Sequence, residues 1–158
     1  GKYGAAEVLG VDISEYACQC AEENAKLNGL ENRVRFITAN AFDLLAEKSR
    51  AGEKYDTIIL DPPAFTKSRA TVDSAKRGYK EINLRAMKML EPGGYLITCS
   101  CSQHVSTDQF VDMINISARD AKKRVRFVEL RSQAHDHPVL PASPETRYLK
   151  CAIMQIFD

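Results

Sequence analysis

The sequence lacks any long apolar run. No stretch approaches the roughly 18 consecutive apolar residues that span a bilayer, and the N-terminal region lacks the charged and apolar segments of a signal peptide. We therefore expect a cytoplasmic protein with no membrane partner. With 158 residues, of which 44% are hydrophobic and 27% charged, the chain has the composition of one globular domain, not of a disordered or membrane chain.

Cysteine is present, but not in the spacing of a metal site. No two cysteines show the CxxC spacing that structural zinc sites repeat, so we expect no metal. The number of cysteines is odd, which favours free thiols in a reducing compartment. They are Cys18, Cys20, Cys99, Cys101 and Cys151.

The net charge is small, at +1, but it conceals a segregation along the chain. Residues 1–65 carry 7 Lys and Arg against 11 Asp and Glu, whereas residues 66–90 carry 7 against 2. The second segment predicts an anionic partner near it. A solvated helix face is the alternative interpretation.

Short apolar runs alternate with amphipathic segments. The pattern predicts strands at residues 7–14, 34–41, 55–60, 95–99, 125–130 and 148–157, and helices at 15–28, 42–49, 72–90 and 107–122. This alternation is typical of a doubly wound, mostly parallel α/β sheet, and the last two strands, joined without a helix, predict an antiparallel pair at its edge. Ligands bind such sheets at the carboxyl ends of the strands.

An acid ends the apolar run of the first predicted strand. Asp12 stands where a carboxylate commonly accepts hydrogen bonds from the two hydroxyls of a nucleoside ribose. Dehydrogenases and methyltransferases both use this arrangement. The alternative is a charge at a helix N-terminus, stabilised by the helix dipole.

The segment Asp61-Pro62-Pro63-Ala64-Phe65 follows the third predicted strand. Its two prolines stiffen the backbone, so that carbonyl groups and the Asp61 carboxylate point into a cleft, and Phe65 can stack on a planar base. Methylation of a flipped base needs both stacking and hydrogen bonds to the base edge. Hydride transfer by a nicotinamide-dependent dehydrogenase explains Asp12 but not this segment, and a rigid turn remains the alternative.

Two cysteines lie in TCSCS, residues 98–102, where the fourth predicted strand ends. In extended backbone they share a face, and Cys99, inside the strand, is expected to be a small buried hydrophobe. Cys101 lies beyond the strand end, shortly before a helix that Ser106 and Gln109 can cap. An accessible thiolate there could act as a nucleophile.

Longer motifs carry a family resemblance. With EVLGVDIS, AEENAKLNG, YDTIILDPPAFTKSR, GYKEIN, LEPGGYLITCSCS and PETRYLK, the sequence resembles the class I S-adenosylmethionine-dependent methyltransferases, and specifically the 23S rRNA cytosine-5 methyltransferases with an N-terminal PUA domain. The resemblance covers essentially the whole chain. It implies a Rossmann-like α/β fold, S-adenosyl-L-methionine as cofactor, ribosomal RNA as partner, and 5-methylcytosine formation through a covalent cysteine intermediate.

The resemblance also implies roles for individual residues. Cys101 matches the nucleophile of the family, and Asp61 would hydrogen-bond the base and stabilise the charge that develops on it. The residues implied in cofactor binding are Asp12, Ile13, Asn40, Ala41, Phe42, Asp61 and Pro62. Those implied in substrate binding are Pro63, Phe65, Lys67 and Arg69, of which the last two begin the basic segment that would hold RNA phosphates.

The sequence departs from the family pattern in two places. Position 40 is Asn where the family tends to have an acid. The first strand, the glycine-rich cofactor loop and the PUA domain of the family are not found, so we expect residues 1–158 to form a partial methyltransferase domain that is impaired alone. In the family strand order 3-2-1-4-5-7-6, the missing strand lies between the strands that end at Asp12 and Asp61. We expect its absence to leave a gap whose unpaired strand edges invite another chain, as in a homodimer.

Two other functions remain open. The chain could be a methyltransferase of guanine or adenine amino groups, for which Cys101 is incidental. It could also be a non-catalytic RNA-binding or assembly module.

Overall fold

The computed structural model describes residues 1–66 and 68–158, with the backbone alone at Arg69. The chain divides into two compact units, Gly1–Glu47 and Lys48–Asp158. Each unit is described below by itself. None of the described helices is both long and apolar enough to cross a membrane.

The first unit is a parallel strand pair with a connecting helix. Strands β1 (Val8–Asp12) and β2 (Val34–Thr38) flank helix α1 (Glu15–Leu27), and helix α2 (Ala41–Ala51) begins in this unit. Ser14 caps α1 as predicted, because its Oγ accepts a hydrogen bond from the Ala17 N–H at 3.2 Å.

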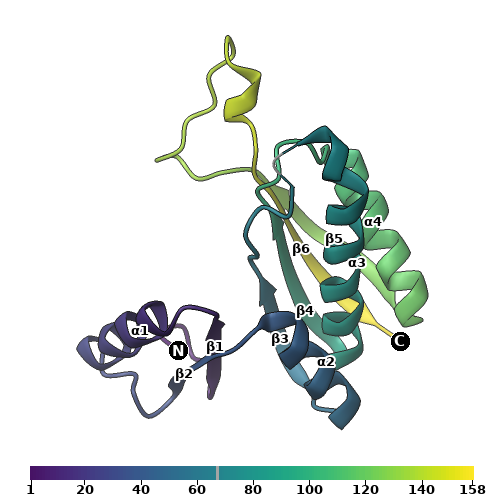
Figure 1. Ribbon diagram of the computed structural model, residues 1–158. Coiled ribbons are helices and arrows are strands. Elements are labelled where there is room, and N and C mark those ends of the chain that lie inside the picture. Colours follow the sequence, from purple (N-terminus) through teal and green to yellow (C-terminus); the bar gives the residue numbers. More distant parts are fainter. Residues whose placement is uncertain (67) are drawn as a thin grey trace. The chain divides into compact units, whose positions relative to one another are not determined.

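The second unit is a mixed sheet covered on one face by two helices (Figure 1). Its strand order is β3-β4-β6-β5, in which β3 and β4 are parallel and the pairs β4–β6 and β6–β5 are antiparallel. The elements are β3 (Tyr55–Leu60), α3 (Val72–Met89), β4 (Leu90–Ser100), α4 (Thr107–Ala121), β5 (Arg124–Arg131) and β6 (Lys150–Phe157), with single 3₁₀ turns at Arg69–Thr71 and Pro144–Thr146.

Apolar side chains of both helices and of the sheet face beneath them form the core of this unit. The side chains predicted to face inward from the two helices are buried. The sheet beneath them ends, as predicted, in an antiparallel edge pair, β6 and β5. The largest fully buried side chains include Tyr79, Met87, Leu96, Phe110, Ile114, Met154 and Ile156. Burying each large apolar side chain stabilises the fold by about 1.5–3 kcal/mol before entropy is counted.

One strand begins earlier than predicted. The sequence places a break at Glu91-Pro92-Gly93-Gly94, and helix α3 does end at Met89, but β4 starts directly at Leu90. Leu90 pairs with Tyr55 before a register shift, and Gly93 adopts a φ of +86° that favours glycine. The break is therefore an irregularity inside the strand.

The two sheets share no strand. Strands β1 and β2 pair only with each other, and β3 and β5 are the edges of the second sheet within the described residues. These pairings agree with the expected gap in strand order. The homodimer that the open edges suggested stays a prediction.

Candidate active site

The segment after β3 packs against helix α3. Leu60 ends the strand as a buried residue and Asp61 is exposed. The ring of half-buried Phe65 lies 4.4 Å, centroid to centroid, from the ring of fully buried Tyr79. Part of the Phe65 surface is thus used inside the protein.

The second segment of interest follows the neighbouring strand. β4 ends at Ser100, and half-buried Cys101 comes next, beyond the strand as predicted. The Cys101 thiol donates a long, weak hydrogen bond of 3.9 Å to the Pro62 carbonyl oxygen. Because β3 and β4 are parallel neighbours, their carboxyl ends bring together two motifs that lie about 40 residues apart in the sequence.

A buried hydroxyl pair fixes the segment after Cys101. The Tyr79 hydroxyl and Ser102 Oγ share a hydrogen bond of 2.9 Å, and both residues are fully buried. The same tyrosine therefore contacts Phe65 of one motif and Ser102 of the other. The helical pattern predicted Tyr79 as a core residue, but nothing local in the sequence indicated the hydroxyl contact.

A helix cap holds the far end of this segment. Ser106 Oγ accepts from the Gln109 N–H at 3.2 Å, and Gln109 Oε1 accepts from the Ser106 N–H at 3.0 Å. This is the predicted capping box, and it confirms where α4 begins.

Sequence reasoning missed a lysine that binds the turn after Cys101. Lys150 is only 7% exposed, and its Nζ donates to the Ser102 and Val105 carbonyl oxygens at 2.7 and 2.8 Å. Burial lowers the pKa of Lys150, whereas the charge of an ionised Cys101 raises it. Alternate residues of β6 are buried, and Lys150 holds the first such position.

Cys99 is half-buried, like Cys101, and not fully buried as predicted. Burial is the main cause that raises the pKa of Cys99 to about 12, followed by its hydrogen bond to the Cys151 thiol and by charges on neighbouring groups. Cys99 and Cys151 are direct partners across β4 and β6. Cys99 therefore stays a neutral thiol near pH 7.

The residues expected to hold a nucleoside gather at the carboxyl ends of β1 and β2. Asp12 Oδ1 accepts from the Ser14 N–H at 2.8 Å, and Asn40 Oδ1 accepts from the Phe42 N–H at 2.9 Å. Within the described part of the chain, Asp12 Oδ2 and Asn40 Nδ2 form no hydrogen bond, so both remain available to a ligand. Ile13 is 73% exposed and Phe42 36%, which leaves apolar surface beside these polar atoms.

Residues 2–141 match a family of methyltransferase domains. The chain belongs to this methyltransferase family.

Curated relatives agree with this assignment. The methyltransferase domain is 42% identical over 157 residues to ribosomal RNA large subunit methyltransferase I of Shewanella denitrificans, and 44% identical over 155 residues to that of Aeromonas salmonicida. These alignments cover 99% and 98% of the chain. The chain spans about 40% of the length of these relatives.

Solved structures show the same class I methyltransferase fold. A SAM-dependent methyltransferase from Streptococcus mutans aligns with a TM-score of 0.81 at 21% identity, covering 96% of this chain and 39% of that one. NSun6 from Pyrococcus horikoshii, crystallised with SFG, aligns with a TM-score of 0.67 at 19% identity, covering 94% of this chain and 41% of that one. At these identities the similarity establishes the Rossmann-like α/β fold of the methyltransferase domain.

The basic segment of the methyltransferase domain lies largely on α3. Lys67 is outside the described residues, and the Arg69 side chain is not described. A hollow of about 290 Å³ between α3 and α4 is lined by Lys76, Arg77, Lys80, Gln109, Asp112, Met113 and Ile116. Three cationic side chains, Lys76, Arg77 and Lys80, therefore border a hollow whose exposed lining is mostly apolar.

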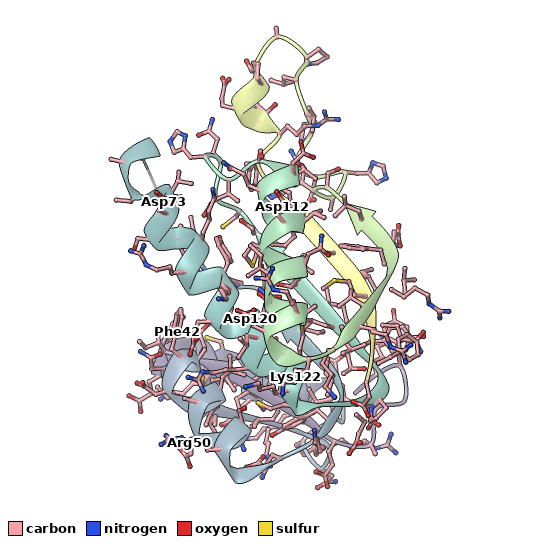
Figure 2. The ribbon with its side chains drawn as sticks, turned by 90° about the vertical axis from the view of Figure 1, so that its right-hand side faces the viewer. Phe42, Arg50, Asp73, Asp112, Asp120 and Lys122 are labelled. Carbon is pink, nitrogen blue, oxygen red and sulfur yellow. The ribbon has the colours of Figure 1, made fainter. Side chains whose placement is uncertain are left out.

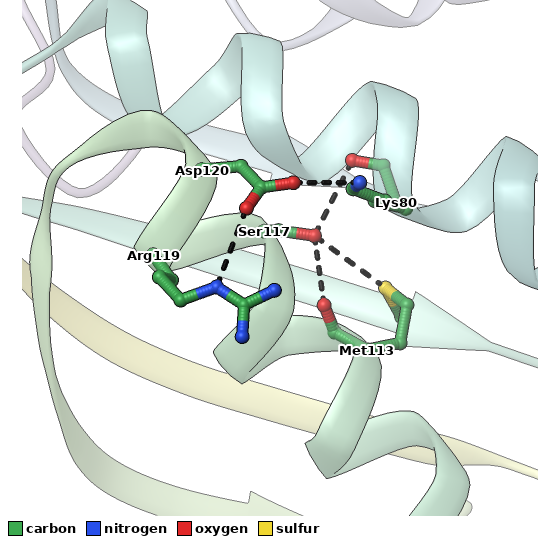
Figure 3. Close-up of polar contacts among 5 residues, drawn as sticks. All are labelled: Lys80, Met113, Ser117, Arg119 and Asp120. Atoms are coloured by element: carbon green, nitrogen blue, oxygen red, sulfur yellow. Dashed lines mark hydrogen bonds and ion pairs between the residues drawn. The ribbon is translucent and has the colours of Figure 1, made fainter.

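Carboxylates of α4 offset part of this charge. Figure 2 shows Asp112 and Asp120 along the helix. The Lys80 Nζ lies 2.6 Å from an Asp120 carboxylate oxygen, and this contact holds the pKa of Asp120 below its ordinary value (Figure 3). No ion pair of the described residues involves Lys76 or Arg77. Those two cations are therefore the better candidates for an external anion.

Proposed function

We propose that the chain is the catalytic domain of an S-adenosylmethionine-dependent methyltransferase that forms 5-methylcytosine in 23S ribosomal RNA. Its nucleophile is Cys101. Membership of the methyltransferase family and the curated rRNA methyltransferases support this assignment. The observation that carries the site is the 3.9 Å contact between Cys101 Sγ and the Pro62 carbonyl oxygen, which joins the thiol to the DPP segment.

Methylation of carbon 5 of cytosine requires a nucleophile such as the Cys101 thiolate. Carbon 5 of cytosine is a poor nucleophile until the Cys101 thiolate adds to carbon 6 and pushes an electron pair onto carbon 5. Carbon 5 would then attack the methyl group that the cofactor supplies, as the carbon–sulfur bond of the sulfonium breaks and leaves a neutral thioether. Loss of the carbon 5 proton and expulsion of the thiolate restore the aromatic ring, so that the enzyme is regenerated and one methyl group has been transferred.

Asp61 and the neighbouring carbonyl groups orient the base. The Asp61 carboxylate is exposed at the end of β3, where it can accept a hydrogen bond from the amino edge of cytosine. A base flipped out of its stack needs such edge contacts. Pro63 and the exposed part of Phe65 supply apolar surface for its plane.

The first unit fits the nucleoside part of the cofactor. Asp12 Oδ2 and Asn40 Nδ2 are an unpaired acceptor and donor among the described residues, suited to ribose hydroxyls and to an adenine ring nitrogen. The exposed side chains of Ile13, Ala41 and Phe42 offer an apolar surface for the adenine plane. S-adenosylmethionine, when bound, supplies the methyl group as a sulfonium.

The basic segment supplies the RNA phosphate contacts. Lys67 and Arg69 follow the DPP segment directly in the sequence, and Lys76 and Arg77 lie further along on α3. Each phosphate neutralised in this way releases counterions, so RNA binding weakens as salt is added.

A second candidate function is methylation of an amino group on guanine or adenine. The Pro62 carbonyl oxygen favours it, because a backbone acceptor at this place can bind an exocyclic amino group. In that reaction the amino nitrogen attacks directly and Cys101 has no covalent role.

Two alanine variants separate the candidates. Cys101→Ala in the full-length protein should lower cytosine methylation by roughly three orders of magnitude or more, whereas Cys99→Ala, a matched loss of a thiol that stays neutral, should keep it. Full activity of Cys101→Ala on an amino group would support the second candidate. RNA binding by the unmodified protein without any methyl transfer would contradict both, and would favour a non-catalytic module.

A further inference from the structure

Lys150 is a buried cation without a carboxylate partner. It opens β6 directly opposite Ser100, the last residue of β4. Two of its three N–H groups bind the carbonyl oxygens of Ser102 and Val105, and among the described residues no other hydrogen bond and no ion pair involves it. A lysine is almost never this buried without a pairing charge.

This arrangement costs free energy. A buried ammonium loses its hydration, and two carbonyl dipoles replace only part of it. A neutral residue that packed against the same turn would avoid this loss. Because burying this charge is unfavourable, we infer that the charge of Lys150 has a function.

The ionisable group that acts on Lys150 is Cys101. The two carbonyl acceptors belong to the turn that starts immediately after this cysteine, and the electrostatic influence of Cys101 on Lys150 raises the pKa that burial lowers. Interactions of this kind are reciprocal, so an ammonium favoured by the thiolate favours the thiolate in return.

We propose that Lys150 is a positioning residue for the nucleophile. Its ammonium ties the turn at residues 102–105 to β6 and sets a positive charge beside Cys101 that favours the thiolate. This inference rests on the proposed role of Cys101. It also gives the lysine of the PETRYLK motif a function.

Other ionisable groups lie at the same end of the sheet as Lys150. The Asp61 carboxylate at the end of β3 and the thiols of Cys101 and Cys151 oppose ionisation of Cys99, whereas the Arg131 guanidinium on β5 interacts favourably with an ionised Cys151. The groups concerned are Asp61, Cys99, Cys151, Arg131, His104 of the turn and Lys150 itself. Lys150 is the cation among them that binds the turn of Cys101.

The first test measures thiolate reactivity without any methyl transfer. Iodoacetamide alkylation of Cys101 is followed from pH 6 to pH 10 by peptide mass spectrometry in the full-length protein and in Lys150→Met, Lys150→Gln and Lys150→Arg. We expect the first two variants to react roughly three- to tenfold more slowly near pH 7.5, with the whole rate profile displaced to higher pH, and the Arg variant to recover most of the rate. The control Lys123→Met, which removes a lysine that is 13% exposed and paired with Asp158, should react like the parent.

A purely structural lysine predicts the opposite pattern. A loosened turn exposes the thiol, so alkylation of the Met and Gln variants would stay equal or become faster. That result would overturn the proposal.

A second measurement works even if the lysine variants do not fold. The titration of Lys150 is followed by NMR of its side chain in the parent and in Cys101→Ala. Removing the thiol should lower the pKa of Lys150, because the thiolate no longer raises it; an unchanged titration would contradict the proposal. Failure of the proposed function is separate, since it would show as cytosine methylation that survives in Cys101→Ala.

Discussion

The hydroxyl pair of Tyr79 and Ser102 should act as one energetic unit. Tyr79→Phe keeps the ring contacts with Phe65 at 4.4 Å and Phe110 at 6.4 Å, but it leaves the buried Ser102 Oγ without its partner. Ser102→Ala leaves the Tyr79 hydroxyl in the same state. An unsatisfied buried hydroxyl costs about 1–3 kcal/mol, so each single variant should lose about that much free energy of unfolding.

The double variant distinguishes a true pair from two separate effects. In Tyr79→Phe with Ser102→Ala both polar groups are gone, so the penalty for an orphaned hydroxyl disappears. We expect the double variant to be at least as stable as either single one, which corresponds to a coupling energy of about 1–3 kcal/mol or more.

Urea unfolding followed by circular dichroism is a suitable assay, since the chain contains no Trp. The slope of the free energy with urea should stay the same in all four proteins, because the surface exposed on unfolding hardly changes. Losses that add within about 0.3–0.5 kcal/mol would refute the reasoning. The hydrogen bond between Tyr79 on α3 and Ser102 would then contribute no coupling energy to the stability of the fold.

Three further predictions concern the cap, Cys99 and the basic segment. Ser106→Ala should lower the free energy of unfolding by about 1 kcal/mol and Ser106→Gly by a few tenths; equal losses in urea titrations would mean that the side-chain cap is not the cause. The pKa of Cys99 is raised from 9.0 to about 12 in the folded chain, so the unfolded chain releases this proton first and stability should fall as the pH rises from 9 towards 12. Cys99→Ala should flatten that fall in pH-dependent unfolding, and an identical pH profile would count against it. Lys76→Gln or Arg77→Gln should weaken binding of ribosomal RNA fragments and reduce the slope of log affinity against log salt by about 0.7–0.9, whereas Arg85→Gln, whose guanidinium already pairs with Glu81, should change it less; equal slopes for all three would reject this assignment.

Local patterns predicted the elements of the fold well. The helix from Val72 and the helix from Thr107 end within about one residue of their predicted ends, because apolar spacing and capping residues act over one or two turns. The prediction was wrong at the start of β4, where two glycines indicated a loop. Pairing of Leu90 with Tyr55 on the neighbouring strand overrides that local signal.

The site was predictable only in part. Cys101 and the DPP segment could be placed at strand ends from the sequence, but their contact depends on β3 and β4 being parallel neighbours. The Tyr79 hydroxyl contact joins residues 23 positions apart, and its geometry depends on how α3 crosses the sheet. Lys150 was missed for another reason: a lysine in an alternating strand is ordinarily assigned to solvent, and only the tertiary fold buries it.

The central claim is that Cys101 and the DPP segment together methylate carbon 5 of cytosine. The full-length protein is incubated with 23S ribosomal RNA and S-adenosylmethionine labelled in the methyl group, and the digested nucleosides are separated by mass spectrometry. The label should appear in 5-methylcytidine and should be lost with Cys101→Ala. Label found instead on the amino group of guanosine or adenosine, and retained by that variant, would contradict the account.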